Sequence, residues 1–278
     1  MKIGIVGLGL IGGSYAKALF QCGYEVFGID VDIDTLAYAE KEGFITKGYM
    51  HPENILKELD VIFLCLYPSQ LKMFFQKHMK DFKEGAVISD VGGIKRIAID
   101  AYNTYKRTDV DFIAAHPMAG KEKSGVEASD ASIFENANLI ITKTKDNKQE
   151  NIDLIRLLAN QMGFKTVSVM SDKEHDQAIS YTSQLTHALA MALINSDDGT
   201  SQTKALIGDS FRDLTRIASI NEILWSELFV NNKDYLLQSI TRFEASLHEI
   251  KQALMKKDTE TLRKLMVNAT KRRQSLDE

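Results

Sequence analysis

The segment that most constrains the fold lies at the N-terminus, where a short apolar run leads directly into a glycine-rich turn. Residues 2–6 have the composition of a buried strand, and the turn reads Gly7-Leu8-Gly9-Leu10-Ile11-Gly12. In such a turn the first glycine permits a tight bend, the second lets the backbone approach a ligand closely, and the third lets helix and strand pack together. The following helix would present free N–H groups to a pyrophosphate. We therefore expect a strand–turn–helix unit that binds a dinucleotide through Gly7, Gly9, Leu10, Ile11 and Gly12.

A carboxylate at the end of the next predicted strand indicates which form of the cofactor is bound. Asp30 follows the apolar run Glu25–Ile29 and lies 18 residues after Gly12, where the adenosine ribose is expected. It would accept hydrogen bonds from the ribose hydroxyls and repel a 2′-phosphate, and Val31 offers no cation to such a phosphate. NAD is therefore favoured over NADP. Asp32 is an alternative to Asp30, but its position past the strand is more typical of a helix N-cap.

Short apolar runs alternate with helical stretches through the first part of the chain. The predicted strands are Lys2–Val6, Glu25–Ile29, Val61–Leu66, Ala86–Ser89, Asp111–Ala115, Leu139–Thr142 and Lys165–Val169. This alternation predicts an α/β fold with an N-terminal Rossmann-type, doubly wound parallel sheet. After about Ser171 prolines are absent and helical periodicity continues, which predicts an all-helical C-terminal domain. We divide the chain into residues 1–170 and 171–278, packed together with a ligand cleft between them.

The composition argues against several classes of function. The 34 Lys and Arg residues are balanced by 38 Asp and Glu without a long block of one sign, so a nucleic-acid partner is not expected. The apolar run Val61–Tyr67 is far shorter than the ~20 residues that cross a bilayer, so no membrane segment is expected. Cys22 and Cys65 lie far apart in apolar segments, which argues against a disulfide framework and a zinc site. We expect a cytoplasmic protein without a metal site.

Among the six histidines, His116 has the position expected of a proton acceptor. It directly follows the predicted strand Asp111–Ala115, and residues at the carboxyl ends of parallel strands face the cofactor cleft. The alternative is a histidine that only satisfies loop carbonyls. His51, His78 and His248 lie in polar or charged stretches, where a function is not expected.

A polar stripe marks the first helix of the predicted helical domain. Asp176, Ser180, Ser183 and His187 recur at spacings of four, three and four residues, which places them on one face of an amphipathic helix. The alternative is a face that is merely solvated.

A third cluster combines arginine with the only tryptophan of the chain. Arg212 and Arg216 lie in the segment Phe211–Ala218, and Trp225 follows nine residues after Arg216. An arginine near an aromatic ring in a cleft suits a substrate that carries a carboxylate. The alternative is that both arginines solvate a helix.

Taken together, the motifs resemble the prephenate/arogenate dehydrogenase family of tyrosine biosynthesis. In chain order they are GLGLIGGS (residues 7–14), SDVGGIK (89–95), AHPMAGKEKSG (115–125), EHD (174–176) and DLTRIA (213–218), followed by Trp225. The resemblance covers nearly the whole chain, and the segment from His116 to Gly125 is its most specific part.

The resemblance implies an NAD-dependent oxidoreductase that converts prephenate to 4-hydroxyphenylpyruvate, or alternatively acts on arogenate. It implies that His116 is the catalytic residue at the ring hydroxyl, that His187 binds substrate, and that Arg216 binds a substrate carboxylate. Glu122 and Asp176 match acidic positions of the substrate pocket and of an inter-subunit polar network. A homodimer through the helical domain is also implied.

The sequence departs from the family pattern at two positions. Gly93 stands where many relatives have a serine, and Gln184 stands where some have a histidine. We expect a backbone N–H or a water to replace the serine hydroxyl. No segment resembles the regulatory domain of longer relatives or a fused mutase, so we expect any feedback control to act at the active site.

Three other interpretations remain open. A 3-hydroxyacid dehydrogenase would place a catalytic lysine on the first helix after the nucleotide domain, but Lys173 lies too early and His187 stands near the expected place. A non-catalytic NAD-binding regulator would not need His116, His187 and Arg216. A scaffold would use its last helices, Tyr235–Leu254 and Thr259–Val267, for dimerisation alone.

Overall fold

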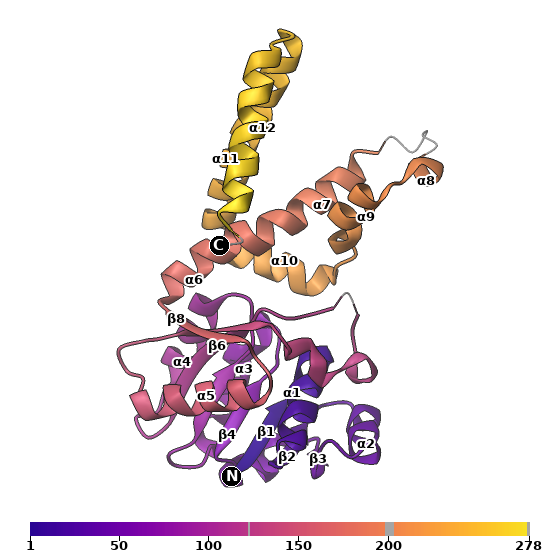
Figure 1. Ribbon diagram of the computed structural model, residues 1–278. Helices are drawn as coiled ribbons and strands as arrows, with labels where there is room; N and C mark the ends of the chain where they lie inside the picture. The colour runs from indigo at the N-terminus through magenta and orange to yellow at the C-terminus, as the bar shows by residue number, and fades with distance from the viewer. Residues whose placement is uncertain (122, 198–202, 277–278) are drawn as a thin grey trace. The chain divides into compact units, whose positions relative to one another are not determined.

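The computed structural model describes residues 1–121, 123–197 and 203–276. By packing, the chain divides into two units, residues 1–232 and residues 233–278. The first unit is built on an eight-stranded sheet in the order β3-β2-β1-β4-β5-β6-β7-β8 (Figure 1). Its strands are β1 (Lys2–Val6), β2 (Glu25–Ile29), β3 (Lys47–Tyr49), β4 (Val61–Leu64), β5 (Val87–Asp90), β6 (Asp111–Pro117), β7 (Asn138–Thr142) and β8 (Thr166–Met170).

All seven predicted strands are present, and two features of the sheet differ from the prediction. β3 was not anticipated, because its three residues at the edge of the sheet are too few to show a period-two pattern. β7 pairs antiparallel with β6, whereas the other neighbouring strands are parallel. A parallel pair needs a long crossover connection, usually an α-helix. Between β6 and β7 the described chain forms only the short 3₁₀ turns η4 (Val126–Ala128) and η5 (Ala131–Phe134).

Helices cover both faces of the sheet, which confirms the doubly wound arrangement. One face packs against α1 (Leu10–Gln21), α2 (Ile33–Lys41) and α5 (Gln149–Gln161), and the other packs against α3 (Pro68–His78) and α4 (Lys95–Tyr105). Because successive side chains of a strand point to opposite faces, Ile3 and Ile5 of β1 join one apolar cluster and Val6 joins the other. The core therefore consists of two layers separated by the sheet. Short 3₁₀ turns complete the connections at η1 (Pro52–Asn54), η2 (Leu56–Glu58) and η3 (Met79–Asp81).

Every described element after β8 is helical, as expected. Those of the first unit are α6 (Asp172–Ile179), η6 (Ser180–Gln184), α7 (Leu185–Asn195), α8 (Thr203–Leu206), α9 (Asp209–Thr215), η7 (Arg216–Ala218) and α10 (Glu222–Asn231). A capping box starts α6, since the Ser171 hydroxyl accepts from the Glu174 N–H and the Glu174 carboxylate accepts from the Ser171 N–H. The segment η6 is a π-helical turn, which shifts the register of the polar stripe predicted on this helix.

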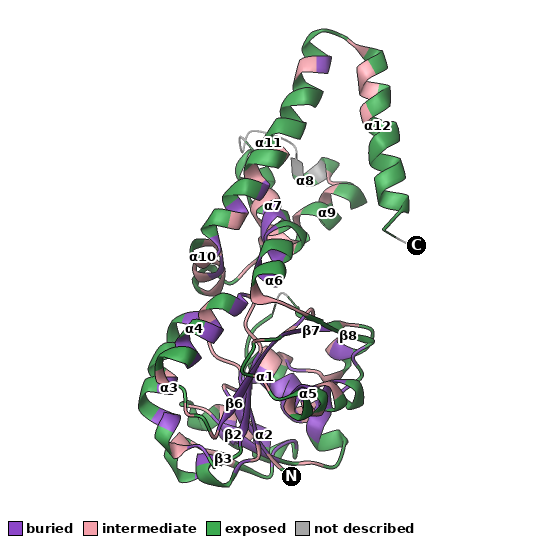
Figure 2. Cartoon of the chain, turned by 90° about the vertical axis from the view of Figure 1, so that its left-hand side faces the viewer, coloured by how far each residue is buried: buried purple, intermediate pink, exposed green. Residues whose placement is uncertain are grey.

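The second unit is the helix pair α11 (Lys233–Met255) and α12 (Thr259–Gln274), whose turn contains Lys257 in a left-handed conformation (φ 53°). Figure 2 shows most of this pair exposed, and α12 has no buried residue. Among the described residues, no helix is both long enough and apolar enough to cross a membrane.

The close approach of α1 to the preceding turn can be tested by substitution. A Cβ on Gly12 would lie 1.8 Å from the Gly7 carbonyl oxygen, whereas a Cβ on Gly9 would meet no atom within 4 Å. We expect Gly12→Ala to lower the free energy of unfolding by about 3 kcal/mol, or Tm by roughly 6–12 °C. The reason is that the backbone at Gly7 must move to make room for the methyl group. Gly9→Ala is the control and should change Tm far less. Equal thermal melts of the two variants would contradict this account of the turn.

Candidate active site

The glycine-rich turn leaves the N-terminus of α1 open. Gly7 has φ 87°, in the region that favours glycine, and Gly9 precedes the first helical residue, Leu10. The first N–H groups of a helix have no intrahelical acceptor and carry a partial positive charge, so they form a binding site for a phosphate. Gly9, Leu10, Ile11 and Gly12 all line one cleft. The absence of any Cβ at Gly9 leaves the space that a pyrophosphate would need, so the turn fits the predicted dinucleotide.

Asp30 follows β2, as predicted, and it supports the glycine-rich turn. It follows the last residue of β2, and its Oδ2 accepts a hydrogen bond from the Leu8 N–H at 2.7 Å. Its Oδ1 accepts from the Asp32 N–H at 3.0 Å. Each carboxylate oxygen can accept a second bond, so Asp30 can still bind a ribose hydroxyl. Asp32 caps α2 by accepting from the Asp34 N–H, as the sequence suggested.

The cleft lies at the carboxyl ends of β1, β4, β5 and β6 and has a volume of about 800 Å³. Residues of the glycine-rich turn form one wall, and residues of η6, α7, η7 and α10 form the opposite wall. Ligands of open α/β sheets bind at this edge of the sheet. Of the predicted site residues, Gly9, Leu10, Ile11, Gly12, His116 and His187 line the cleft together.

His116 lies near the end of β6, with its ring between the cleft and a second histidine. Its Nδ1 is 2.9 Å from Nε2 of His175, and its Nε2 lies 3.8 Å from the position of a Cβ on Gly93, another lining residue. The pKa of His116 lies well below its usual value, mainly because the ring is removed from water and also because His175 and the Lys95 cation lie near. The ring is therefore neutral at pH 7 and can accept a proton.

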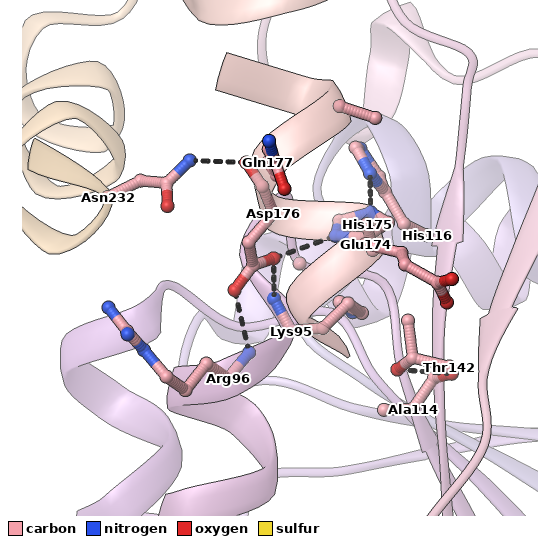
Figure 3. Close-up of polar contacts among 12 residues, drawn as sticks. Lys95, Arg96, Ala114, His116, Thr142, Glu174, His175, Asp176, Gln177 and Asn232 are labelled. Carbon is pink, nitrogen blue, oxygen red and sulfur yellow. Dashed lines mark hydrogen bonds and ion pairs between the residues drawn. The ribbon is translucent and has the colours of Figure 1, made fainter. Parts of the chain in front are cut away.

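Asp176 is not among the residues that line the cleft. Its carboxylate makes the polar contacts drawn in Figure 3. The residue is 1% exposed, and its carboxylate accepts from the Lys95 N–H at 2.8 Å, from the Arg96 N–H at 3.1 Å, and from Nδ1 of His175 at 2.7 Å. The first two donors belong to the N-terminus of α4. The predicted contact of Asp176 with substrate therefore has no support in this geometry, since its oxygens face α4 and His175. Its backbone carbonyl accepts a further bond from Asn232 at 2.8 Å.

A buried ion pair between Lys95 and Asp90 lies next to the two histidines. Lys95 is 0% exposed, and its ammonium group donates to Asp90 Oδ2 at 2.6 Å and to the Ala115 carbonyl. Asp90 also accepts from the Gly92 N–H at 3.0 Å and from the Ala115 N–H at 3.2 Å. The pair thus fixes the backbone immediately before His116.

His187 lies on α7 and stacks on Trp225 of α10, with ring centroids 3.7 Å apart and an angle of 30° between the rings. Its Nδ1 donates to the Ser183 carbonyl at 2.8 Å. Both rings and Ser183 line the cleft. The predicted polar stripe is therefore divided at η6: Ser183 and His187 face the cleft, while Asp176 and Ser180 are buried outside its lining.

The two remaining predicted substrate residues are Arg216 and Glu122. Arg216 is the first residue of η7 and is exposed, and it is not among the residues that line the cleft, although Ile217 is. Glu122 lies outside the described residues; its neighbours Lys121 and Lys123 line the cleft.

Both departures from the family pattern line the cleft, at Gly93 and at Gln184. A Cβ on Gly93 would lie 3.3 Å from Cδ2 of Leu228. Gln184 is buried, where its Nε2 donates to the Leu228 carbonyl at 3.0 Å and its Oε1 accepts from Asn232 at 2.8 Å. Gln184 therefore joins η6 to the end of α10.

His175, Lys95 and Asp90 are functional candidates that the motifs alone did not indicate, although all three lie within those motifs. A signal was present for Asp90, because it ends a buried strand at the same edge of the sheet as His116. Nothing in the spacing indicates that His175 faces His116, since the two residues are 59 positions apart.

Two family models match the chain in succession. The model described as prephenate dehydrogenase, nucleotide-binding domain, matches residues 15–168, and the model described as prephenate dehydrogenase, dimerization domain, matches residues 171–268. A prephenate dehydrogenase of Lactococcus lactis is 32% identical over 99% of this chain and 77% of its own length.

Solved structures give the same result. The chain is similar to a prephenate dehydrogenase of Aquifex aeolicus in complex with hydroxyphenyl propionate and NAD⁺, with a TM-score of 0.88, 29% identity, and coverage of 99% of this chain and 98% of that one. It is also similar to a Synechocystis arogenate dehydrogenase, with a TM-score of 0.84, 25% identity, and coverage of 99% and 100%.

The position of Asp30 predicts how cofactor preference can be changed. The double variant Asp30→Ser/Val31→Arg should raise kcat/KM for NADP relative to NAD by at least roughly tenfold, because a repelling carboxylate is replaced and a cation is added. The control Asp32→Ala should lower Tm, because the side chain that caps α2 is lost, and should leave the preference unchanged. Equal kcat/KM of the unaltered enzyme for NAD and NADP would overturn the assignment of Asp30.

Proposed function

Because the chain belongs to the prephenate dehydrogenase family, we propose that it catalyses the NAD-dependent oxidative decarboxylation of prephenate to 4-hydroxyphenylpyruvate in tyrosine biosynthesis. Membership of this family confirms the resemblance that the motifs indicated, together with the expected oxidoreductase class and the NAD cofactor. The observation that carries the proposal is that one cleft contains both the glycine-rich turn and His116.

In the proposed reaction His116 is the general base. NAD⁺, when bound, accepts the hydride that leaves the carbon bearing the substrate hydroxyl. His116 takes the hydroxyl proton as the carbonyl develops, and returns it to the ring oxygen once loss of carbon dioxide makes the ring aromatic. A neutral imidazole suits this role, and the lowered pKa of His116 keeps it neutral.

Substrate binding is proposed to involve His187, Arg216 and Glu122. The stack on Trp225 holds the His187 ring in the cleft wall, which limits the entropy lost when substrate binds. Lys123 adds positive charge to the cleft lining, in keeping with a substrate that carries two carboxylates, whereas the charge of Lys121 is paired with Asp130. Arogenate, in which an amino acid side chain replaces the pyruvyl group, is the alternative substrate, and the Synechocystis relative is named for it.

We also propose a homodimer formed through the helical part of the chain. The second family model describes a dimerization domain. The helix pair of the second unit exposes large apolar side chains, which in monomers are usually covered. These are Leu237, Leu247, Ile250, Leu254 and Met255 on α11 and Met266 and Val267 on α12.

The division of roles and the location of the protein remain predictions. We assign NAD binding to residues 1–170, and substrate binding and dimerisation to residues 171–278. Both cysteines, Cys22 and Cys65, are free thiols, and the cytoplasmic location was expected from their number and spacing.

The proposed function is tested by following absorbance of reduced cofactor with prephenate or arogenate as substrate. We expect turnover of prephenate, and we expect His116→Asn to lower kcat by ~10²–10⁴ while Tm and NAD binding are kept. Since burial holds the pKa of His116 well below its usual value, the rate should not fall at the pH where an ordinary histidine is protonated, but only at lower pH. Turnover of arogenate alone would reassign the substrate, and full activity of a folded His116→Asn enzyme would remove His116 from the reaction.

Arg216 can be tested against a neighbouring arginine. If it binds a carboxylate, Arg216→Ala should raise KM for prephenate roughly 10- to 100-fold and leave KM for NAD unchanged, because about 1.5–3 kcal/mol of charge-assisted hydrogen bonding is lost. Arg216→Lys should recover part of this loss, since a point charge does not reproduce the planar guanidinium. Arg212→Ala is the matched control, because Arg212 is exposed on α9 and pairs with Asp209. A lowered Tm with an unchanged KM would show that Arg216 is structural.

A further inference from the structure

We propose that His175 is a positioning residue that fixes the ring proton of His116 on Nδ1, so that Nε2 of His116 accepts the proton of the substrate. This inference rests on the proposed function only in taking His116 as the general base. The evidence is a chain of hydrogen bonds that runs from the N-terminus of α4 through Asp176 and His175 to His116 (Figure 3).

Asp176 determines which group donates and which accepts in this series of hydrogen bonds. The backbone N–H groups of Lys95 and Arg96 can only donate, so both carboxylate oxygens of Asp176 accept. Nδ1 of His175 lies 2.7 Å from Oδ1, which already accepts from Lys95. The carboxylate has no proton to give, and Nδ1 of His175 must therefore donate.

The proton on His175 determines the proton on His116. A neutral imidazole carries one N–H, so with Nδ1 protonated the Nε2 of His175 can only accept. That nitrogen lies 2.9 Å from Nδ1 of His116, which must donate to it. Nε2 of His116 is then left with a lone pair, on the side of the ring nearest to Gly93 and the cleft.

The surrounding charges keep both rings neutral, as this pattern requires. Burial is the largest cause that lowers the pKa of each ring, and the Lys95 cation lowers both further. The Asp176 carboxylate raises the pKa of His175, but the net shift is downward. Lys95 is held in place by Asp90, the other charged group close to the pair.

Burial also makes the arrangement rigid. His175 is 0% exposed and Asp176 1% exposed, so water does not compete for the bonds between them. Once His116 has accepted the substrate proton, the same chain places the new positive charge next to an acceptor that leads to a carboxylate. In the Ser-His-Asp triad a carboxylate holds the catalytic histidine in one tautomer directly, and here His175 stands between the carboxylate and the base.

The first test reads the tautomer directly and needs no substrate. In ¹⁵N–¹H spectra of the ring nitrogens at about pH 8, above the usual pKa of histidine, we expect His116 to carry its proton on Nδ1 and none on Nε2. The His116→Asn spectrum assigns the signals. A proton on Nε2 of His116 would overturn the proposal, whether or not prephenate proves to be the substrate.

The second test separates positioning from structure. His175→Leu removes the acceptor at similar volume, so the buried Nδ1–H of His116 loses its partner. The proton of His116 can then lie on Nε2, which leaves no lone pair there to accept the substrate proton. We expect kcat to fall about 10- to 100-fold, the usual effect of removing the residue that orients a site histidine, with KM for NAD unchanged. His175→Gln offers an amide oxygen near the same place and should recover most of this loss. The control His51→Leu, at an exposed histidine, should leave kcat unchanged.

Two kinetic outcomes would overturn the proposal. One is a folded His175→Leu enzyme with unaltered kcat, and the other is equal loss in His175→Leu and His175→Gln with a matching fall in Tm. If His175→Leu does not fold, the spectrum of the unaltered protein decides. Failure to turn over prephenate would count against the proposed function alone, because the tautomer is measured without substrate.

Discussion

The Asp176 carboxylate joins the helices that follow the sheet to the sheet itself. It accepts two hydrogen bonds from the N-terminus of α4, where the helix carries partial positive charge, and a third from His175. Without it, buried donors would lack an acceptor, at a cost of about 1–3 kcal/mol each. One side chain therefore joins α6 to α4 at the edge of the sheet. The position of α6 in turn determines where η6 and α7 form a wall of the cleft.

The buried ion pair of Lys95 and Asp90 stabilises the backbone next to His116. Removing two charges from water is costly, and such a pair persists only where further hydrogen bonds satisfy both groups. Here Asp90 accepts from two backbone N–H groups and Lys95 donates to the Ala115 carbonyl, next to His116. The pair thus fixes the backbone at the end of β6. Burial is the main cause of the lowered pKa of both neighbouring histidines, and the Lys95 cation lowers it further. Structural stability and the protonation of His116 depend on the same side chains.

Local patterns in the sequence predicted the elements on which the site is built. The glycine-rich turn was recognisable because its glycines are required by close contacts within a few residues. A Cβ on Gly12, for example, would lie 1.8 Å from the Gly7 carbonyl oxygen. The seven strands were recognisable as apolar runs bounded by turns. β3 was missed because three residues carry no pattern, and the antiparallel pairing of β7 was missed because direction depends on how the connection folds. The π-helical turn η6 was missed because one additional residue in a turn leaves no trace in composition.

The sequence by itself determined the Rossmann-type sheet, the dinucleotide turn, Asp30 after β2, and His116 at the edge where ligands bind, because each depends on neighbours close in the chain. Only the tertiary structure decided that His175 faces His116, that Asp176 accepts from α4 outside the cleft lining, and that His187 stacks on Trp225. These contacts join residues 38 to 81 positions apart, the separations of His187 from Trp225 and of Lys95 from Asp176. The packing of helices against the sheet, which no local pattern records, brings them together.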